Sequence, residues 1–328
     1  MDQNQNQSTV EQPSKEEVFA YRIKKILNDM GDQMSCYNQY KARTKVWGQI
    51  VPIPCGKCLG CRLEKARQWA VRCVHEAQMY EDNCFITLTY NDENLPKDRN
   101  IEKKELQTFF KNLRNHTKKQ GIRYYACGEY GDQKGRPHYH ACVFNYDFTD
   151  KELLRDSQYF RAKNHFSKNN QINALYTSPT LSNIWKKGFH TIGEVTFESA
   201  GYVARYIQKK ITGPMADDYY KRDYMESGSE KRTPEFALMS RMPGIGYPWI
   251  EKYFTDVYPK DFFTINGVKN KPVRYYDDYL KKRDPDLHIK LKEARQKKAI
   301  EDEITRLKDK EKHKILTTKS LQRKFENE

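Results

Sequence analysis

The 328-residue chain has no uninterrupted apolar run of bilayer length, and its first residues, MDQNQNQSTVEQPSKEE, contain no apolar stretch of the kind that directs secretion. We therefore expect no membrane segment and a cytoplasmic location. Internal repeats of solenoid length are also absent from the sequence, which argues against a stacked-repeat architecture. Without a secretory signal, the eight cysteines are expected to be thiols or metal ligands and not disulfides.

Acidic residues are outnumbered: 44 Asp and Glu face 59 Lys and Arg, which gives a formal net charge of +15. Aromatic residues make up 13% of the chain and include 23 tyrosines. This combination fits a polyanionic partner such as nucleic acid better than it fits a membrane or an acidic small molecule. Lysine also serves simply to solvate a surface, so the site chemistry must decide.

Composition and pattern divide the chain into five segments. Residues 1–17 are polar and without apolar periodicity, which is typical of a disordered tail. A Cys-rich segment with a helix (18–80) precedes the main domain (81–215), and an aromatic-rich segment (216–275) is expected to pack on that domain. Residues 276–328 form a charged, helix-favouring tail, which is either a solvated helix or a DNA-binding arm.

Apolar periodicity and β-branched content predict four strands and three helices. The expected strands are 84–90, 124–129, 138–144 and 189–195, and the expected helices are 63–80, 102–120 and 199–210. Gly121 is expected to end the second helix. The loop YGDQKGRP joins the second and third strands, so these two should pair antiparallel. The predicted fold class is α+β, with a central antiparallel sheet flanked by helices and a helical C-terminal extension.

A candidate metal site lies on the predicted hairpin. His138 and His140 are two residues apart, so a β-strand sends both imidazoles to the same face. Glu129 ends the preceding strand and supplies a carboxylate beside them. Such a ligand set leaves open positions on a divalent ion, which then acts as a Lewis acid on a phosphoryl oxygen. Taken alone, a His-x-His pair on a strand is more often structural or incidental.

Two tyrosines in GYVARYIQKK are candidate nucleophiles. Tyr202 and Tyr206 are four residues apart, which places them on one face of a helix about 5.4 Å apart along its axis. Lys209 and Lys210 follow near the same face, where they could hold phosphate. The alternative is an aromatic stripe that packs in the core. A phenol, with a pKa near 10, also needs activation before it attacks phosphate, and the metal would provide it.

Cys55, Cys58 and Cys61 recur at three-residue spacing, which lets their sulfurs converge on one ion. The best fourth ligand is Cys36, because Cys73 would lie about 18 Å further along a helix that begins at Cys61. A structural zinc site and a reduced cluster that binds nothing are equally open. An iron–sulfur cluster fits less well, because none of the expected chemistry is redox.

The segments FITLTY, GEYGDQKGRPHYH and YVARYIQKK occur in the order found in HUH-superfamily replication initiators. The whole chain resembles the replication initiators of microviruses, small single-stranded DNA phages, and in particular their gokushovirus branch. Weaker similarity extends through PCGKCLGCR and SRMPGIG and covers residues 36–279. The resemblance implies the HUH fold, an RRM-like antiparallel sheet with the His-x-His strand in its middle.

The resemblance also implies roles for the candidate residues. The ligands of Mg²⁺ or Mn²⁺ would be Glu129, His138 and His140. Tyr202 and Tyr206 would be paired nucleophiles, and Lys209 falls where the family has a lysine after its second tyrosine. One tyrosine would cut a single-stranded DNA origin, form a 5′-phosphotyrosine and release a 3′-hydroxyl for the host replication machinery. Rolling-circle synthesis would follow in the bacterial cytoplasm, and the second tyrosine would then serve in strand joining.

Three other functions compete with this interpretation. An HUH relaxase or transposase uses the same chemistry, although relaxases usually complete the metal site with another histidine and small transposases use one tyrosine. A non-catalytic module would bind single-stranded nucleic acid through exposed aromatics and leave no covalent product. A water-using metallonuclease would cut DNA without becoming attached to it.

Overall fold

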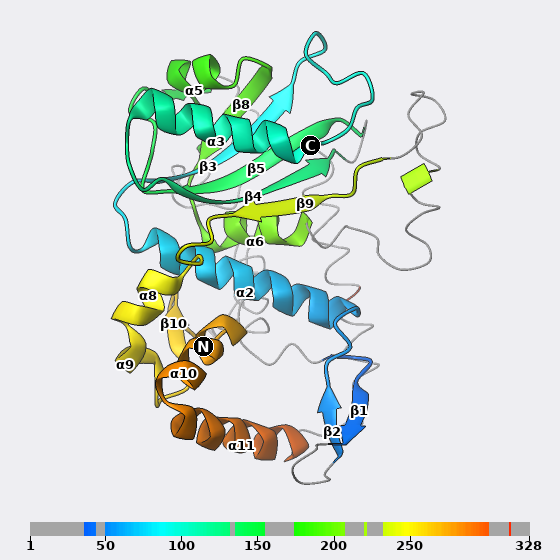
Figure 1. Ribbon diagram of the computed structural model, residues 1–328, viewed down its shortest axis with the longest axis vertical. Helices are drawn as coiled ribbons and strands as arrows, with labels where there is room; N and C mark the ends of the chain where they lie inside the picture. Colours follow the sequence, from blue (N-terminus) through cyan, green and yellow to red (C-terminus); the bar gives the residue numbers. More distant parts are fainter. Residues whose placement is uncertain are drawn as a thin grey trace, which may run out of the picture.

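The computed structural model describes residues 36–43, 50–131, 135–154, 174–206, 220–221, 232–301 and 315. A seven-stranded antiparallel sheet dominates it, with strand order β6-β7-β8-β3-β5-β4-β9 (Figure 1). Its strands are β3 (Asn83–Tyr90), β4 (Arg123–Tyr130), β5 (Pro137–Phe144), β6 (Glu152–Leu153), β7 (Tyr176–Thr177), β8 (Gly188–Gly193) and β9 (Phe236–Met239). The α+β fold with a central antiparallel sheet and flanking helices is confirmed.

The remaining elements are eight described helices and two short antiparallel ribbons. The helices are α2 (Leu59–Ala77), α3 (Lys103–Thr117), α5 (Pro179–Ile184), α6 (Phe197–Tyr206), α8 (Tyr247–Lys252), α9 (Phe254–Val257), α10 (Arg274–Arg283) and α11 (Pro285–Glu301). The ribbons pair β1 (Tyr40–Arg43) with β2 (Ile50–Ile53), and β10 (Phe263–Ile265) with β11 (Val268–Asn270). None of the helices in the described ranges is long and apolar enough to cross a membrane.

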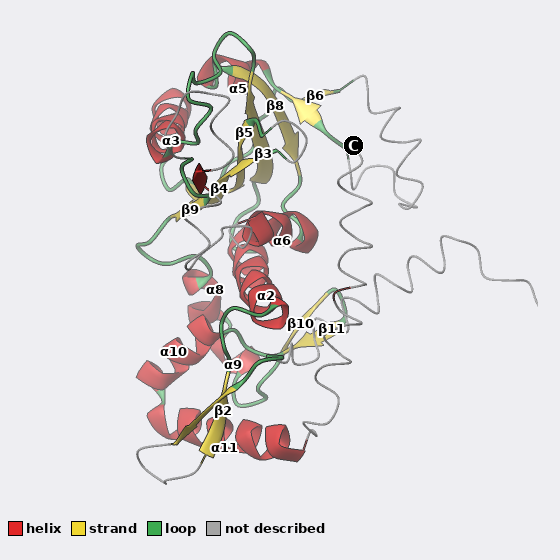
Figure 2. Cartoon of the chain, turned by 90° about the vertical axis from the view of Figure 1, so that its right-hand side faces the viewer, coloured by secondary structure: helices red, strands yellow, loops and turns green. Residues whose placement is uncertain are grey.

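The two faces of the sheet carry different cores. Strand β3 alternates between partly buried and fully buried residues, as a strand with two differently covered faces must. Ile86 and Leu88 pack with Phe109 and Phe110 of α3 on one face. On the other face, α2 and α6 pack against β4 and β5. In both views α8 to α11 gather below α2, on its far side from the sheet (Figures 1 and 2).

Helix α6 is held in place by its N-terminus and by α2. The hydroxyl of Thr196 accepts a hydrogen bond from the Ser199 N–H at 3.1 Å, which caps the helix just before Phe197. Small residues line the contact with α2: a Cβ placed on Gly201 would lie only 3.8 Å from the Cβ of Ala70. Small side chains let the two helix backbones approach closely, so α2 fixes the position of the helix that carries Tyr202.

Several expected boundaries are wrong. Helix α3 ends at Thr117 and not at Gly121, because Lys118 takes the left-handed conformation (φ 52°) and its N–H donates to the carbonyl of Arg114. Helix α2 begins four residues earlier than expected, directly after Cys58. The sequence pattern also missed β9, which continues the sheet beside β4 and so extends it beyond residues 81–215.

Other expectations hold within narrower limits. The strands expected over 124–129 and 138–144 form the antiparallel pair β4 and β5. Helices α10 and α11 occupy the segment expected to be a charged helical tail as far as Glu301. The expected disordered tail, residues 1–17, and the end of the tyrosine helix, residues 207–210, lie outside the described residues.

Candidate active site

The β4–β5 hairpin brings the expected metal ligands onto one face of the sheet. Glu129 lies directly opposite His138, and Cys127 lies opposite His140. Residues two apart on a strand share a face, and so do directly paired residues on neighbouring strands. Glu129, His138 and His140 therefore all face the side of the sheet on which α6 lies, as the sequence pattern predicts.

His140 is held from both sides of its ring. Its Nε2 lies 2.7 Å from Oε1 of Glu129, and its Nδ1 lies 3.0 Å from the hydroxyl of Thr87 on β3. Both members of the His140–Glu129 pair are buried, with exposed fractions of 5% and 4%. Because an ionised carboxylate only accepts, Nε2 carries a proton in this pair, and a bound cation would take the place of that proton.

His138 has a different environment. Its Nδ1 lies 2.6 Å from the carbonyl oxygen of Arg136. A carbonyl cannot donate, so the proton sits on Nδ1 and Nε2 keeps its lone pair, as in a metal-binding histidine fixed by a backbone carbonyl. Burial lowers the pKa of His138 below its usual value, which favours this neutral form. Its ring is nearly parallel to that of His140, and the two centroids are 6.4 Å apart.

The donor set fits a hard divalent ion. Cis ligands about 2.1 Å from an octahedral ion lie about 3.0 Å from one another, close to the 2.7 Å that separates Nε2 of His140 from Oε1 of Glu129. The offset ring of His138 makes the three-residue set looser than the pair. Within the described ranges, the group whose ligand atoms all lie within 4.8 Å of one another is the four-cysteine group.

Tyr202 lies against this site. Its ring meets the ring of His140 edge-on, with centroids 5.2 Å apart and an interplanar angle of 85°. Phe85 of β3 also contacts Tyr202 edge-on, at 6.5 Å. Helix α6 buries Val203 and Ala204 in the core while Tyr202 stays half-buried. Tyr202 is therefore part of the site and not of the apolar stripe that packs against the sheet.

The other expected catalytic residues are only partly described. Tyr206 is the last described residue of α6, and its side chain lies outside the described residues. Lys209 and Lys210 lie outside them altogether. Their roles stay predictions, and the observed part of the site consists of Tyr202, the two histidines and Glu129.

The sequence pattern missed two residues of this face. Thr87 positions His140, and Phe189 of β8 is 68% exposed. Phe189 pairs with Thr89, which in turn pairs with His138, so these three residues form a row across β8, β3 and β5. At about 4.8 Å between strands, Phe189 lies about 10 Å from His138. Threonines at alternate positions of an otherwise apolar strand were the available signal for Thr87.

Comparisons with known proteins identify the family. Residues 83–211 match the model of a family of replication-associated proteins of the ORF2 type. Replication-associated protein VP4 of Bdellovibrio phage phiMH2K is 33% identical over 286 residues, which cover 79% of this chain and 83% of that protein. The chain belongs to this family of phage replication-associated proteins. The matched range includes every candidate metal ligand and both tyrosines.

Two further relatives support the membership. Replication-associated protein ORF2 of Spiroplasma virus 4 is 37% identical over 237 residues, 69% of this chain and 66% of that protein. Replication-associated protein ORF4 of Chlamydia phage 1 is 30% identical over 234 residues, 70% of this chain and 54% of that protein. The resemblance to microvirus replication proteins is thereby confirmed. No solved structure matches the chain.

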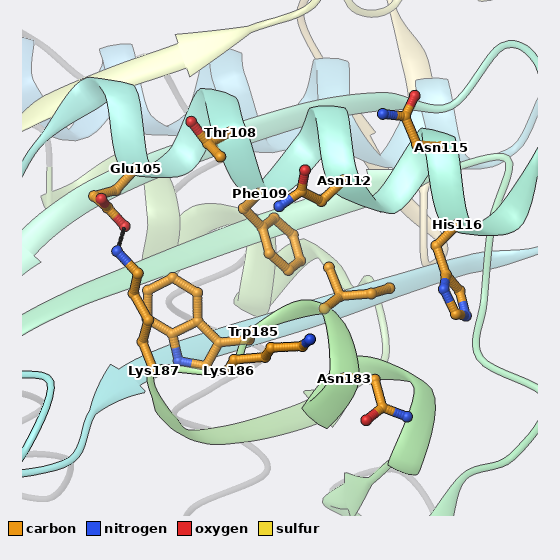
Figure 3. Close-up of a pocket in the computed structure, with 11 residues that line it drawn as sticks. Glu105, Thr108, Phe109, Asn112, Asn115, His116, Asn183, Trp185, Lys186 and Lys187 are labelled. Carbon is orange, nitrogen blue, oxygen red and sulfur yellow. Dashed lines mark hydrogen bonds and ion pairs between the residues drawn. The ribbon is translucent and has the colours of Figure 1, made fainter.

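This replication-associated protein also has a polar groove of about 590 Å³ between α3 and α5. Lys187 and Glu105 form an ion pair of 2.6 Å at one end, and the side chains of Asn112 and Asn183 approach it from the two helices (Figure 3). The groove lies with α3 and α5, on the face of the sheet opposite α6. None of the residues that line it is a candidate metal ligand or nucleophile.

Proposed function

We propose that this replication-associated protein starts rolling-circle replication by nicking a single-stranded DNA origin through tyrosine and later rejoins the strand. The observation that carries the proposal is the contact between Tyr202 and His140, whose Nε2 is paired with Glu129. A nucleophilic side chain next to a candidate metal site is the arrangement that tyrosine-based phosphoryl transfer needs.

The chemistry divides between the metal ligands and the tyrosine. Glu129, His138 and His140 would hold Mg²⁺ or Mn²⁺, which when bound stabilises negative charge on the scissile phosphate. The phenol oxygen of Tyr202 or Tyr206 attacks phosphorus, a new P–O bond forms to the tyrosine, and the bond to the 3′ oxygen breaks. That oxygen gains a proton and becomes a 3′-hydroxyl. The 5′-phosphotyrosine keeps the energy of the phosphodiester, so no nucleotide cofactor is required for joining.

The open part of the same face supports a path for single-stranded DNA. Phe189 presents an aromatic ring to solvent in line with Thr89 and His138. Unpaired bases stack on exposed aromatic side chains, and a chain with a net charge of +15 attracts the phosphate backbone. We propose that Phe189 stacks a base close to the scissile phosphate.

Phe189→Ala should weaken binding of a single-stranded origin oligonucleotide about 5- to 150-fold, because stacking of one base contributes about 1–3 kcal/mol. Fluorescence anisotropy at fixed salt measures the change. Phe189→Trp should retain binding, and Ile289→Ala, which removes an exposed apolar side chain from α11, should leave it unchanged. Equal affinity of the Phe189→Ala and wild-type proteins would contradict the stacking role.

The proposed activity is tested by incubating the purified chain with Mn²⁺ and labelled single-stranded oligonucleotides that tile the phage genome. The products are resolved on a denaturing gel. We expect label to migrate with the protein for at least one oligonucleotide and to disappear when a chelator is added beforehand. Cleavage without attached label would indicate a water-using nuclease. Binding without cleavage throughout the tiled set would indicate a non-catalytic module.

A further inference from the structure

Four cysteines from three parts of the chain meet at one end of α2. Cys36 precedes β1, Cys55 and Cys58 lie in the turn between β2 and α2, and Cys61 lies in the first turn of that helix. Their sulfur atoms all lie within 4.8 Å of one another. The candidate active site uses none of these residues.

The spacing of the sulfurs fits a single tetrahedral ion. Zinc holds thiolate sulfur at about 2.3 Å, so two ligands of a tetrahedral site lie about 3.8 Å apart. The sulfurs of Cys36 and Cys58 are 3.8 Å apart. All four cysteines are free thiols in the structure. A multi-iron cluster needs a wider cage, because its thiolates bind different iron atoms.

The backbone around the cysteines is arranged for thiolates. The N–H groups of Lys57 and Cys58 point to the sulfur of Cys55 at 3.4 and 3.3 Å, and the N–H of Cys55 points to the sulfur of Cys36 at 3.1 Å. Gly56 makes this turn possible with a φ of +73°. Sulfur is a weak acceptor as a thiol and a stronger one as a thiolate, so these contacts favour the form that binds metal.

The β1–β2 ribbon that follows Cys36 has little apolar support. Tyr40 and Ile53 at its ends are 60% and 44% exposed, and an isolated two-stranded ribbon is at best marginally stable in water. In contrast, Cys36 is 4% exposed. A cross-link among the cysteines would therefore fasten the ribbon to the start of α2, in place of a hydrophobic core.

We infer that Cys36, Cys55, Cys58 and Cys61 bind one structural zinc ion that fixes the β1–β2 ribbon to the N-terminus of α2. Four thiolate ligands close the coordination sphere and leave no open position for a substrate, so the ion acts in folding and not in catalysis. This inference is independent of the proposed nicking activity, because it concerns residues outside that site.

The test is the metal content of the full-length protein, produced without a histidine tag and dialysed against a weak chelator. We expect one zinc ion per chain by inductively coupled plasma mass spectrometry. Replacement by Co²⁺ should give the intense visible bands and the near-ultraviolet charge-transfer band of a tetrahedral cobalt thiolate. Zinc should be lost in Cys58→Ser and in Cys61→Ser, and the melting temperature of both variants should fall.

Two control variants separate this site from the rest of the protein. Cys84→Ala removes a buried cysteine of β3 outside the group and should keep one zinc ion. The double variant His138→Ala/His140→Ala should also keep it. Should the serine variants fail to fold, the wild-type protein still gives an answer: a thiol-modifying reagent should release zinc as it labels these four cysteines, located by peptide mass spectrometry.

Several results would overturn the inference. Four titratable thiols without bound zinc would show that the group is simply reduced, and a mass two hydrogens below expectation would show a disulfide. A visible spectrum of bound iron in the purified protein would replace zinc by iron. Zinc retained by both serine variants would place the ion elsewhere.

Discussion

Replacing both Tyr202 and Tyr206 by phenylalanine should reduce formation of the covalent protein–DNA adduct by at least about 10³-fold, because the double variant has no phenol oxygen to attack the phosphate. The fold should survive, since phenylalanine keeps the ring that contacts His140 and Phe85. The measurement is a single-turnover assay with Mn²⁺ and the cleaved oligonucleotide, read as label that stays with the denatured protein.

The single variants should separate the two tyrosines. Tyr202 lies 5.2 Å from the ring of His140, so Tyr202→Phe should slow the first cleavage more than Tyr206→Phe does. Tyr247→Phe is the matched control, because the hydroxyl of Tyr247 on α8 bonds only to Glu251 among the contacts described. A double variant that still forms the adduct at the wild-type rate would show that another residue is the nucleophile.

His140→Ala should lower the nicking rate by about 10³-fold, since loss of a Lewis-acid metal removes several kcal/mol of transition-state stabilisation. The His140 imidazole is the group that joins Glu129 to Thr87, so its removal also separates the remaining ligands. His116→Ala provides the control, because His116 lines the groove between α3 and α5 on the other face of the sheet. A His140→Ala rate equal to that of the wild type would exclude the metal site.

A milder effect is expected at Thr87, which acts on the metal site through His140. Thr87→Val keeps the shape of the side chain but removes the hydroxyl that lies 3.0 Å from Nδ1 of His140. Partners of this kind typically change metal affinity about 10- to 100-fold. The variant should therefore need more Mn²⁺ for half-maximal nicking and recover at high Mn²⁺. A lower rate that Mn²⁺ does not restore would assign Thr87 a different role.

The elements around the site could be predicted because their sequence signals are local. Alternating apolar residues flank a loop rich in glycine between β4 and β5, and this pattern alone fixes the register that places Glu129 beside His138. Helix α6 follows from apolar periodicity in the same way. The spacing of Tyr202 and of the two histidines then determines which face each side chain occupies.

Features that depend on contacts distant in sequence could not be predicted. Strand β9 is four residues long and joins the sheet only because β4 leaves an edge for it. The end of α3 depends on the left-handed Lys118, whose side chain does not announce that conformation. The exposure of Phe189 is equally hidden, since an aromatic residue in a strand is usually buried. The convergence of Cys36 with Cys55 likewise crosses a stretch of chain with no continuous pattern.

Peptide mapping of the protein–DNA adduct tests the central claim most directly. Trypsin cuts after Lys187, Arg205 and Lys209, so Tyr202 is the sole tyrosine of peptide 188–205 and Tyr206 is the sole tyrosine of peptide 206–209. After nuclease digestion of the bound strand, we expect a nucleotide phosphate on one or both peptides, with Tyr202 modified first. A modified residue on any other peptide, or a cut strand with both peptides unmodified, would contradict tyrosine-based nicking by this helix.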